Sequence, residues 1–460
     1  MKRRKKARKR HVPGSPGLPV IRPNVAGVDI DAEEIYVAGP PKARRKPNVR
    51  VFGATTPQLE AAADWLASLG VESVAMESTG VYWIPLYELL EARGFEVYLV
   101  NGREVHNVPG RKSDMNDSQW IQLLHSCGLL RASYRPAESI CALRALRRQM
   151  ENLVAERSKT IQWMQKALDQ MNVRVHRAVT DLTGKTGLSI VRAIVAGGRD
   201  PRVLAELRDP RCRKSVEQIA EDLTGNWREE HLFNLGMALR HYDHLESQIA
   251  EYDAELTRQI RALCPPDRRD ATAPDHAKPA KRRAMRSRGQ ESLRQDLWRL
   301  LCQDLTSIDG VSATTALTVA TEVGPDLDAF PDEKHFISWL RLAPGTRYSG
   351  GKPLPKKKAS TASTYLSSAL RMAATTLRLS KSALGAAYRR IAYRKGQGVA
   401  IFAMARKLAS LIYRMLRYGQ EYVDEGMKLY EERFERQQLR RLISMARERG
   451  YELKPAESAA

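Results

Sequence analysis

The sequence lacks several features that would direct it to a membrane or to an oxidising compartment. No apolar run approaches the ~20 residues of a membrane-spanning helix, and the basic N-terminus is not followed by the apolar stretch of a secretory signal. The five cysteines lie far apart without a CxxC pair, so we expect neither a disulfide framework nor a structural zinc site. These absences predict a cytoplasmic protein with reduced thiols and no membrane partner.

Acidic residues are scarce relative to basic ones. The 460 residues include 76 Lys and Arg against 53 Asp and Glu, which gives a formal net charge of +23. The first ten residues, MKRRKKARKR, account for only about a third of this excess. A merely soluble basic protein is the alternative, but basic charge throughout the body favours a polyanionic partner, because each neutralised phosphate releases counterions. We therefore expect a nucleic-acid-binding protein.

The N-terminal third has the pattern of a mixed sheet. Residues 1–23 are basic and proline-rich and are expected to be an unfolded arm. In residues 24–136, three short strands precede alternating helices and strands, the order of a ribonuclease-H-like fold. The expected strands are Val25–Ile30, Glu34–Ala38, Val49–Phe52, Ser73–Met76 and Glu96–Val100, with helices at Pro57–Leu69, at Tyr82–Arg93 and from about Asp114.

The rest of the chain reads as predominantly helical, so the predicted fold class is α/β followed by α. We expect a helical coiled-coil region with an insertion, a basic Pro/Ala linker, a domain with a Gly-rich basic loop, and a C-terminal helix with a tail. These segments are assigned to residues 137–263, 264–296, 297–420 and 421–460. The apolar seams in residues 137–263 fit either an antiparallel hairpin within one chain or a coiled coil between subunits.

Four carboxylates are candidates for chemistry. Asp29 lies in the first strand (GVDID), Glu77 ends the fourth (AMESTG), and Asp114 and Asp117 are three apart at a helix start (KSDMNDSQW). Each has a structural alternative, since acids also stabilise helix N-termini. A ribonuclease-H-like sheet would bring the four together, where they would repel one another unless cations neutralise them. Two Mg²⁺ ions ~3.5–4 Å apart would suit phosphodiester transfer.

A second candidate is the loop TRYSGGK, which contains Ser349. Gly350 and Gly351 allow close backbone approach, and the surrounding cations suit phosphate binding. The serine is either a nucleophile toward phosphorus or an ordinary turn residue on a DNA-binding loop, and the residues alone favour the second. The expected nucleic-acid-binding residues are Arg103, Arg111, Lys112, Arg347, Lys352, Lys356, Lys357 and Lys358.

An ordered set of motifs carries a resemblance to a known family. GVDID, MESTGVYWIPLYELL and KSDMNDSQWIQLLHSCGLL, followed by IDGVSATTALTVATEVG and LAPGTRYSGGK, resemble the DEDD transposases of the insertion-sequence-110 family, also called bridge-RNA-guided recombinases. The resemblance covers residues 25–171 and 305–418. It implies a RuvC-like N-terminal domain, a coiled-coil middle and a C-terminal transposase domain. Its four-acid motif falls on Asp29, Glu77, Asp114 and Asp117, and its catalytic serine on Ser349.

The resemblance also implies a mechanism and partners. In such enzymes the serine attacks DNA and forms a transient phosphoserine link, while the acidic residues bind Mg²⁺ or Mn²⁺. The implied partners are double-stranded donor and target DNA, a structured guide RNA and further copies of the chain, as a dimer or tetramer associated with the prokaryotic nucleoid. The expected function is RNA-guided excision and insertion of a mobile element. A RuvC-like nuclease for branched DNA and a non-enzymatic nucleic-acid scaffold remain alternatives.

Overall fold

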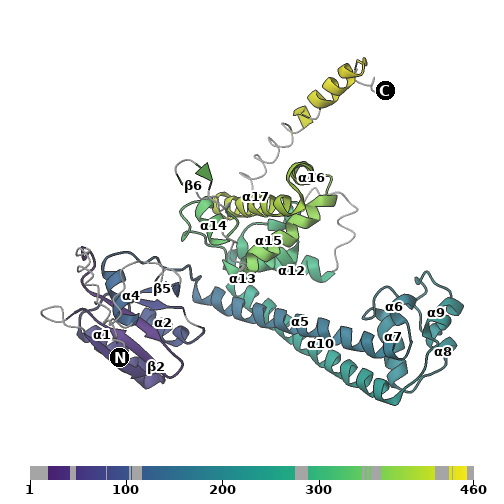
Figure 1. Ribbon diagram of the computed structural model, residues 1–460, viewed down its shortest axis with the longest axis horizontal. Helices are drawn as coiled ribbons and strands as arrows, with labels where there is room; N and C mark the ends of the chain where they lie inside the picture. Colours follow the sequence, from purple (N-terminus) through teal and green to yellow (C-terminus); the bar gives the residue numbers. More distant parts are fainter. Residues whose placement is uncertain are drawn as a thin grey trace, which may run out of the picture. The chain divides into compact units, whose positions relative to one another are not determined.

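The computed structural model shows two compact units, an N-terminal unit (Met1–Arg135) and a C-terminal unit (Pro136–Ala460) (Figure 1). No helix within the described ranges is long and apolar enough to cross a lipid bilayer. The residues that the structure describes are 19–41, 48–78, 80–102, 105, 117–274, 288–343, 348–349, 352–353, 364–419, 432, 435–437 and 439–452.

The N-terminal unit is built on a five-stranded mixed sheet in the order β3-β2-β1-β4-β5. The first three strands form an antiparallel meander, whereas β1, β4 and β5 run parallel. The sequence predicted all five strands and the mixed pairing. The strands are β1 (Val25–Ile30), β2 (Glu34–Ala38), β3 (Val49–Gly53), β4 (Ser73–Glu77) and β5 (Glu96–Val100).

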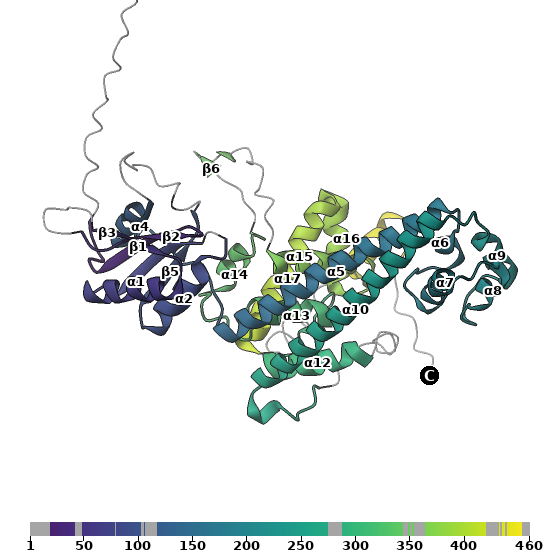
Figure 2. The same cartoon turned by 90° about the horizontal axis from the view of Figure 1, so that it is seen from below.

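Helices cover both faces of the sheet, as Figure 2 shows. On one face, Val28 and Met76 pack with Leu66 of α1 and with α2 in one hydrophobic core. On the other face, Ala75 packs with Ile121 of α4 in a smaller core. Alternate strand residues point to opposite faces, so β4 can be apolar on both. The helices are α1 (Thr56–Ser68), α2 (Trp83–Ala92) and α4 (Asp117–Ser126).

Gly27 allows α4 to lie directly on β1. A Cβ atom at this position would be 2.3 Å from the backbone nitrogen of Gln122 and 2.4 Å from the carbonyl oxygen of Ser118. Real Cβ atoms essentially never come so close to backbone, and a helix backbone cannot yield as a flexible side chain can. Glycine is therefore required at this contact by the space available.

Two long helices of the C-terminal unit lie side by side, α5 (Glu138–Gln170) and α10 (Glu229–Leu263) (Figures 1 and 2). Their apolar seams face each other within one chain, as the buried Met164 and Leu239 of a shared core show. Of the two arrangements that the sequence left open, the structure has the antiparallel hairpin. Ion pairs between the helices, such as Arg157 with Glu246, add to the apolar contact.

The chain between these helices forms a small lobe at one end of the hairpin, hereafter the distal lobe. Its core shares apolar residues of all four lobe helices with α5 and α10, so the insertion predicted within the helical region is folded onto the hairpin. A capping box at Ser215 and Gln218 fixes the start of its last helix. The lobe helices are α6 (Val175–Ala178), α7 (Lys185–Val195), α8 (Pro201–Glu206) and α9 (Val216–Leu223).

The remaining helices form a second body of the C-terminal unit. An aromatic group of Phe330, Phe336, Trp339 and Tyr413 packs within it, and the Tyr413 hydroxyl donates a hydrogen bond of 2.9 Å to the carbonyl of Phe330. Its elements are α12 (Arg288–Leu301), η3 (Leu305–Ser307), α13 (Ala313–Glu322), α14 (Glu333–Trp339), β6 (Tyr348–Ser349), β7 (Lys352–Pro353), α15 (Tyr365–Thr376), η4 (Leu377–Leu379), α16 (Ala383–Lys395) and α17 (Gln397–Tyr418).

Two segments differ from the predictions. The sequence predicts one long helix over roughly residues 361–394. In the structure this helix is broken between η4 and α16, because Ser380 and Ser382 leave helical geometry and Ser382 caps the next helix through the N–H of Gly385. The segment expected as a linker, residues 264–296, is structured on both sides of its undescribed middle. η2 (Pro266–Arg268) follows α10, Ala273 is buried against Gln295, and α12 begins at Arg288.

We predict that Gly27→Ala lowers the free energy of unfolding of the N-terminal unit by about 2–3 kcal/mol, because the new methyl group would push α4 away from β1. Urea-induced unfolding followed by tryptophan fluorescence and circular dichroism measures this change. Gly53→Ala is the matched control, since a Cβ there would make ordinary contacts, with the Gln58 side chain at 3.5 Å and the Glu33 carbonyl oxygen at 4.0 Å. Equal midpoints for the two variants would contradict the close approach of α4.

Candidate active site

Asp29 and Glu77 occupy the ends of two neighbouring parallel strands. In the register of β1 and β4, Val28 lies opposite Met76, so the two acids follow at the same level. Side chains two residues apart on a strand share a face, so Asp29 lies on the same face as Gly27, and Glu77 on the same face as Ala75. Gly27 and Ala75 both face α4. The acids are therefore neighbours on one face, on strands ~4.8 Å apart. Both are partly buried.

Helix α4 runs antiparallel to β1 and brings Asp117 to the same edge of the sheet. Near the helix start, Ser118 touches Gly27, and in the middle the Gln122 side-chain amide donates a hydrogen bond of 3.3 Å to the Val25 carbonyl. Toward its end, His125 Nε2 lies 2.8 Å from Ser73 Oγ, at the beginning of β4. The helix N-terminus thus lies over the carboxyl ends of β1 and β4, and Asp117 is its first residue.

The Glu77 carboxylate lies against the chain that follows β5. A Cβ atom at Gly102 would be 2.1 Å from Glu77 Oε1 and 2.8 Å from Glu77 Cδ, so the missing side chain makes room for the carboxylate. Ser78 continues the contact, since its N–H donates a hydrogen bond of 3.0 Å to the Val100 carbonyl. The strand end therefore holds the acidic side chain in a defined place beside β5.

The charge of Asp29 also acts on its neighbour Tyr36, which lies opposite it on β2. The pKa of Tyr36 is raised, first by its hydrogen bond to Glu34 and by the charge of Glu34, then by partial burial and by the charges of Asp31 and Asp29. Carboxylates are the hard oxygen ligands that divalent cations prefer. Among the residues with described positions, no group of three His, Cys, Asp or Glu is close enough to hold a metal ion as the side chains stand.

Several predicted residues lie outside the described part of the chain. They are Asp114, Arg103, Arg111, Lys112, Arg347, Lys356, Lys357 and Lys358. The roles predicted for these residues therefore stay predictions from the sequence.

For Ser349, the structure describes the backbone. It lies in β6, which pairs with β7 so that Ser349 is opposite Lys352, one of the predicted phosphate-binding residues. Two glycines, Gly350 and Gly351, separate the paired positions in the sequence, the spacing of a tight hairpin. The acids belong to the N-terminal unit and Ser349 to the C-terminal unit.

Four serines that follow Ser349 in the sequence are rival candidates for the nucleophile, and the structure describes two of them, Ser367 and Ser368. Ser367 is buried in α15, where its N–H is used by the cap of Thr364. Ser368 is partly exposed, and its hydroxyl accepts a hydrogen bond of 3.1 Å from Arg371. Burial removes Ser367 from consideration as a nucleophile. Ser360 and Ser363 lie outside the described residues.

His125 is the histidine that packs into the sheet of the N-terminal unit, and its position excludes it from the acidic edge. Burial, together with the positive charge of Arg22, lowers its pKa to about 4, so it is neutral at physiological pH. It bonds to Ser73 at the opposite end of the strands from Asp29 and Glu77. We therefore assign it to the packing of α4 on the sheet.

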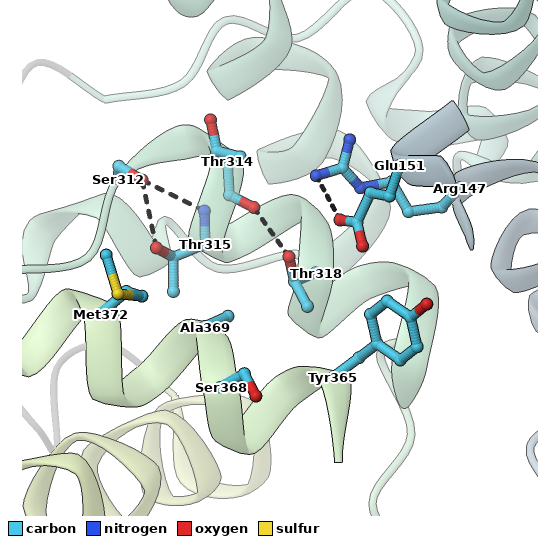
Figure 3. Close-up of a pocket in the computed structure, with 10 residues that line it drawn as sticks. All are labelled: Arg147, Glu151, Ser312, Thr314, Thr315, Thr318, Tyr365, Ser368, Ala369 and Met372. Carbon is cyan, nitrogen blue, oxygen red and sulfur yellow. Dashed lines mark hydrogen bonds and ion pairs between the residues drawn. The ribbon is translucent and has the colours of Figure 1, made fainter. Parts of the chain in front are cut away.

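A hydroxyl-lined pocket in the C-terminal unit was missed by the sequence reasoning. It has a volume of about 560 Å³ and lies between α5, α13 and α15, with Ser312, Thr315 and Thr318 along one side (Figure 3). Ser312 caps α13 by accepting a hydrogen bond of 3.1 Å from the Thr315 N–H. Opposite, Arg147 forms a 2.7 Å ion pair with Glu151. The signal available in the sequence was the hydroxyl-rich run SATTALT, residues 312–318, which directly follows IDGV.

The same pocket borders the start of α15. Tyr365, the first residue of α15, lines it, and the Arg148 guanidinium lies over the Tyr365 ring at 4.7 Å from the centroid. Arg148 also makes a bidentate contact with Glu322 of α13 at 2.9 and 3.0 Å. Arg148 therefore ties α5 to α13 and to the start of α15. Hydroxyls, a helix N-terminus and arginines are groups that contact phosphates.

Comparison with known families identifies two matching regions. Residues 26–173 match the model of the insertion-sequence-110 DEDD transposases, and residues 302–389 match that of the transposase family IS116/IS110/IS902. The first region contains β1 to β5 and α4, and the second contains α13, Ser349 and α15. No curated protein matches the chain. DEDD transposases generally act with a divalent metal ion. With both transposase regions present in order, the chain belongs to the insertion-sequence-110 transposase family and is an enzyme that acts on DNA.

Proposed function

We propose that this transposase excises and inserts its mobile element by cutting and rejoining DNA strands, with Ser349 as nucleophile and with Asp29, Glu77, Asp114 and Asp117 as a metal-binding group. The observation that carries the acidic half of the proposal is the meeting of the ends of β1 and β4 with the start of α4 on one face. Three of the four acids of the family motif come from these three places.

The sheet supports the assignment of the N-terminal unit as a RuvC-like, ribonuclease-H-like domain. Its order β3-β2-β1-β4-β5, with an antiparallel meander followed by parallel strands, is the mixed arrangement expected of that fold. In parallel strands the carboxyl ends share an edge, where functional side chains collect. The positions of Asp29 and Glu77 follow this rule.

The donor set of the acidic edge suits a divalent cation. The three described acids offer carboxylate oxygens, and the missing side chain at Gly102 makes room for the carboxylate of Glu77. Asp29, Glu77, Asp114 and Asp117 would hold Mg²⁺, with Mn²⁺ as a substitute of similar chemistry. The cation would supply charge stabilisation for the phosphodiester group during cleavage.

The chain's own residues would carry the transfer. The Ser349 oxygen would form a bond to phosphorus while the bond from phosphorus to a deoxyribose oxygen breaks, leaving a phosphoserine link. Attack by a deoxyribose oxygen of the partner strand would reverse the step and restore the serine. Arg347, Lys352, Lys356, Lys357 and Lys358 would hold the phosphates of the strand beside the hairpin.

A structured guide RNA and further copies of the chain complete the proposal. The net charge of +23 suits a protein that grips nucleic-acid backbones and leaves sequence selection to base pairing. Because the acids and Ser349 belong to different units, a dimer or tetramer could combine them from different protomers. That same division also favours a second candidate, a nuclease in which the acidic edge cuts branched DNA with water and without Ser349.

We predict that Ser349→Ala abolishes strand exchange, because no other group forms the covalent link, while duplex DNA binding changes less than twofold. Strand exchange between labelled donor and target DNA, with trapping of the protein–DNA adduct, measures the first effect, and fluorescence anisotropy of a labelled duplex measures the second. Ser368→Ala is the control, since this hydroxyl already accepts a hydrogen bond from Arg371. Wild-type exchange by Ser349→Ala would support the water-using nuclease instead.

We predict that Glu77→Gln reduces DNA cleavage more than about 100-fold, because it removes a charge from the acidic edge while keeping the side-chain shape. Gly102→Ala should cost about 10- to 100-fold, because its methyl group displaces the carboxylate without removing it. Cleavage rates at increasing Mg²⁺ concentration, with the melting temperature of each variant, test this. Gly94→Ala is the control for adding a methyl group away from the carboxylate, because a Cβ there meets no atom within 4 Å. The positive φ of Gly94 makes its melting temperature part of the comparison. Full cleavage activity of Glu77→Gln would contradict a role of this acid in the reaction.

We predict that the affinity for duplex DNA falls steeply with salt, with a log–log slope of about −0.9 for each phosphate contacted. Fluorescence anisotropy of a labelled duplex between 50 and 300 mM salt, on the order of the physiological range, gives the slope. Deleting residues 1–10 should weaken nonspecific binding and flatten the slope, with little change in cleavage at saturating DNA. A flat dependence for the full chain would contradict binding through its basic residues.

A further inference from the structure

A groove runs between α5 and α10 next to the distal lobe. It has a volume of about 600 Å³ and is lined from both helices of the hairpin. Figures 1 and 2 both show these helices side by side up to the lobe. The lining residues used here are Trp163, Lys166 and Gln170 of α5, with Asn234, Met237 and His241 of α10.

An aromatic platform forms one part of this groove. The rings of Trp163 and His241 are nearly parallel, at 20° with centroids 6.3 Å apart, and Trp163 leaves 54% of its surface exposed. Beside them, Met237 is 46% exposed. Large apolar side chains that are exposed to solvent in a groove would be stabilised if a ligand buried them. A flat, π-stacking ligand would cover this surface.

The rest of the groove is polar without being acidic. Gln170 and Asn234 present amides, which pair with the edges of bases, and Lys166 supplies a cation for a phosphate. None of the lining residues is Asp or Glu. The nearby Glu156 contacts His241 at 3.3 Å. Stacking surface, amides and a lysine together match the chemistry of a nucleotide.

We propose that this groove binds an unpaired nucleotide of RNA, with the base stacked on Trp163, its edge facing Gln170 and Asn234, and its phosphate near Lys166. A base inside a duplex has no free face to stack on a side chain, whereas loops of structured RNA expose such bases. A structured RNA carries such bases in its loops before any DNA strand is opened, so the proposal commits to RNA, and single-stranded DNA is the rival ligand in the test. The inference rests on the proposed guide RNA and names one place where it docks.

A second copy of the chain is the other possible occupant, and the composition argues against it. Interface cores are depleted in Lys and gain from fully apolar contact. Here a lysine and two amides share the groove with the aromatic residues. A protein partner would have to satisfy each of these polar groups on burial, whereas a nucleotide does so with its own edge and phosphate.

The test is binding of a labelled 12-nucleotide single-stranded RNA to the full chain, by fluorescence anisotropy at a fixed, moderate salt concentration. Trp163→Ala should weaken this binding about tenfold, since stacking of a base is lost. Trp163→Phe, which keeps an aromatic face, should stay within about threefold of the parent chain. Lys166→Ala should reduce the log–log slope of RNA affinity against salt concentration by about one, the loss expected for one phosphate contact.

Controls separate the groove from general charge and from folding. Phe233→Ala removes another exposed aromatic of α10, 67% exposed and outside the groove, and should change RNA binding less than twofold. Duplex DNA binding should be the same for Trp163→Ala and the parent chain. Unchanged melting temperatures show that each variant is folded.

Four outcomes would overturn the proposal. The first is that Trp163→Ala binds RNA as well as the parent chain does, and the second is that it loses duplex DNA binding as much as RNA binding. The third is that the parent chain binds single-stranded DNA more tightly than RNA. The fourth is that Trp163→Ala keeps its RNA binding but has a changed oligomeric state in light scattering. The last would make the groove an interface between copies. This assay measures RNA binding without strand exchange. A negative result would therefore refute the groove proposal and say nothing about Ser349, and a negative result for Ser349→Ala in strand exchange would say nothing about the groove.

Discussion

The contact between Gly27 and α4 is the constraint on which the acidic edge depends. Because β1 carries no side chain at this point, the backbone of α4 lies directly on the strand, and the antiparallel course of the helix then fixes where it begins. That beginning is Asp117, over the end of the strand that carries Asp29. A side chain at residue 27 would separate helix and strand, and Asp117 would move away from its neighbours on β1 and β4.

Much of this arrangement can be predicted from the sequence, and the reason is local. The alternation in GVDID and AMESTG gives the strands and the faces of their acids, because successive strand residues point to opposite sides. The parallel pairing of β1 with β4 follows from the order of strands and helices. The course of α4 across β1 could not be predicted, because it depends on the space at Gly27, and a glycine in a strand also fits a bulge or a turn.

Other features were open in the sequence for physical reasons. The seams of α5 and α10 have the same spacing whether the partner helix belongs to the same chain or to another, so only the structure distinguishes them. The break between η4 and α16 follows from the hydroxyls of Ser380 and Ser382, which compete with the helix backbone, a choice that tertiary contacts decide. The hydroxyl-lined pocket needed three helices to meet, which no local pattern reports.

Helix α5 connects the features of the C-terminal unit. At Arg148 it holds Glu322, only 4% exposed, and the ring of Tyr365 at the start of α15. At Trp163, fifteen residues further along the helix and therefore ~22 Å away, it forms the groove with α10. A continuous helix packed along α10 bends little. A nucleotide held at Trp163 would therefore stand at a set distance from the contact between Arg148 and Tyr365 at the start of α15, so the spacing along a bound RNA could be measured against a fixed helical length.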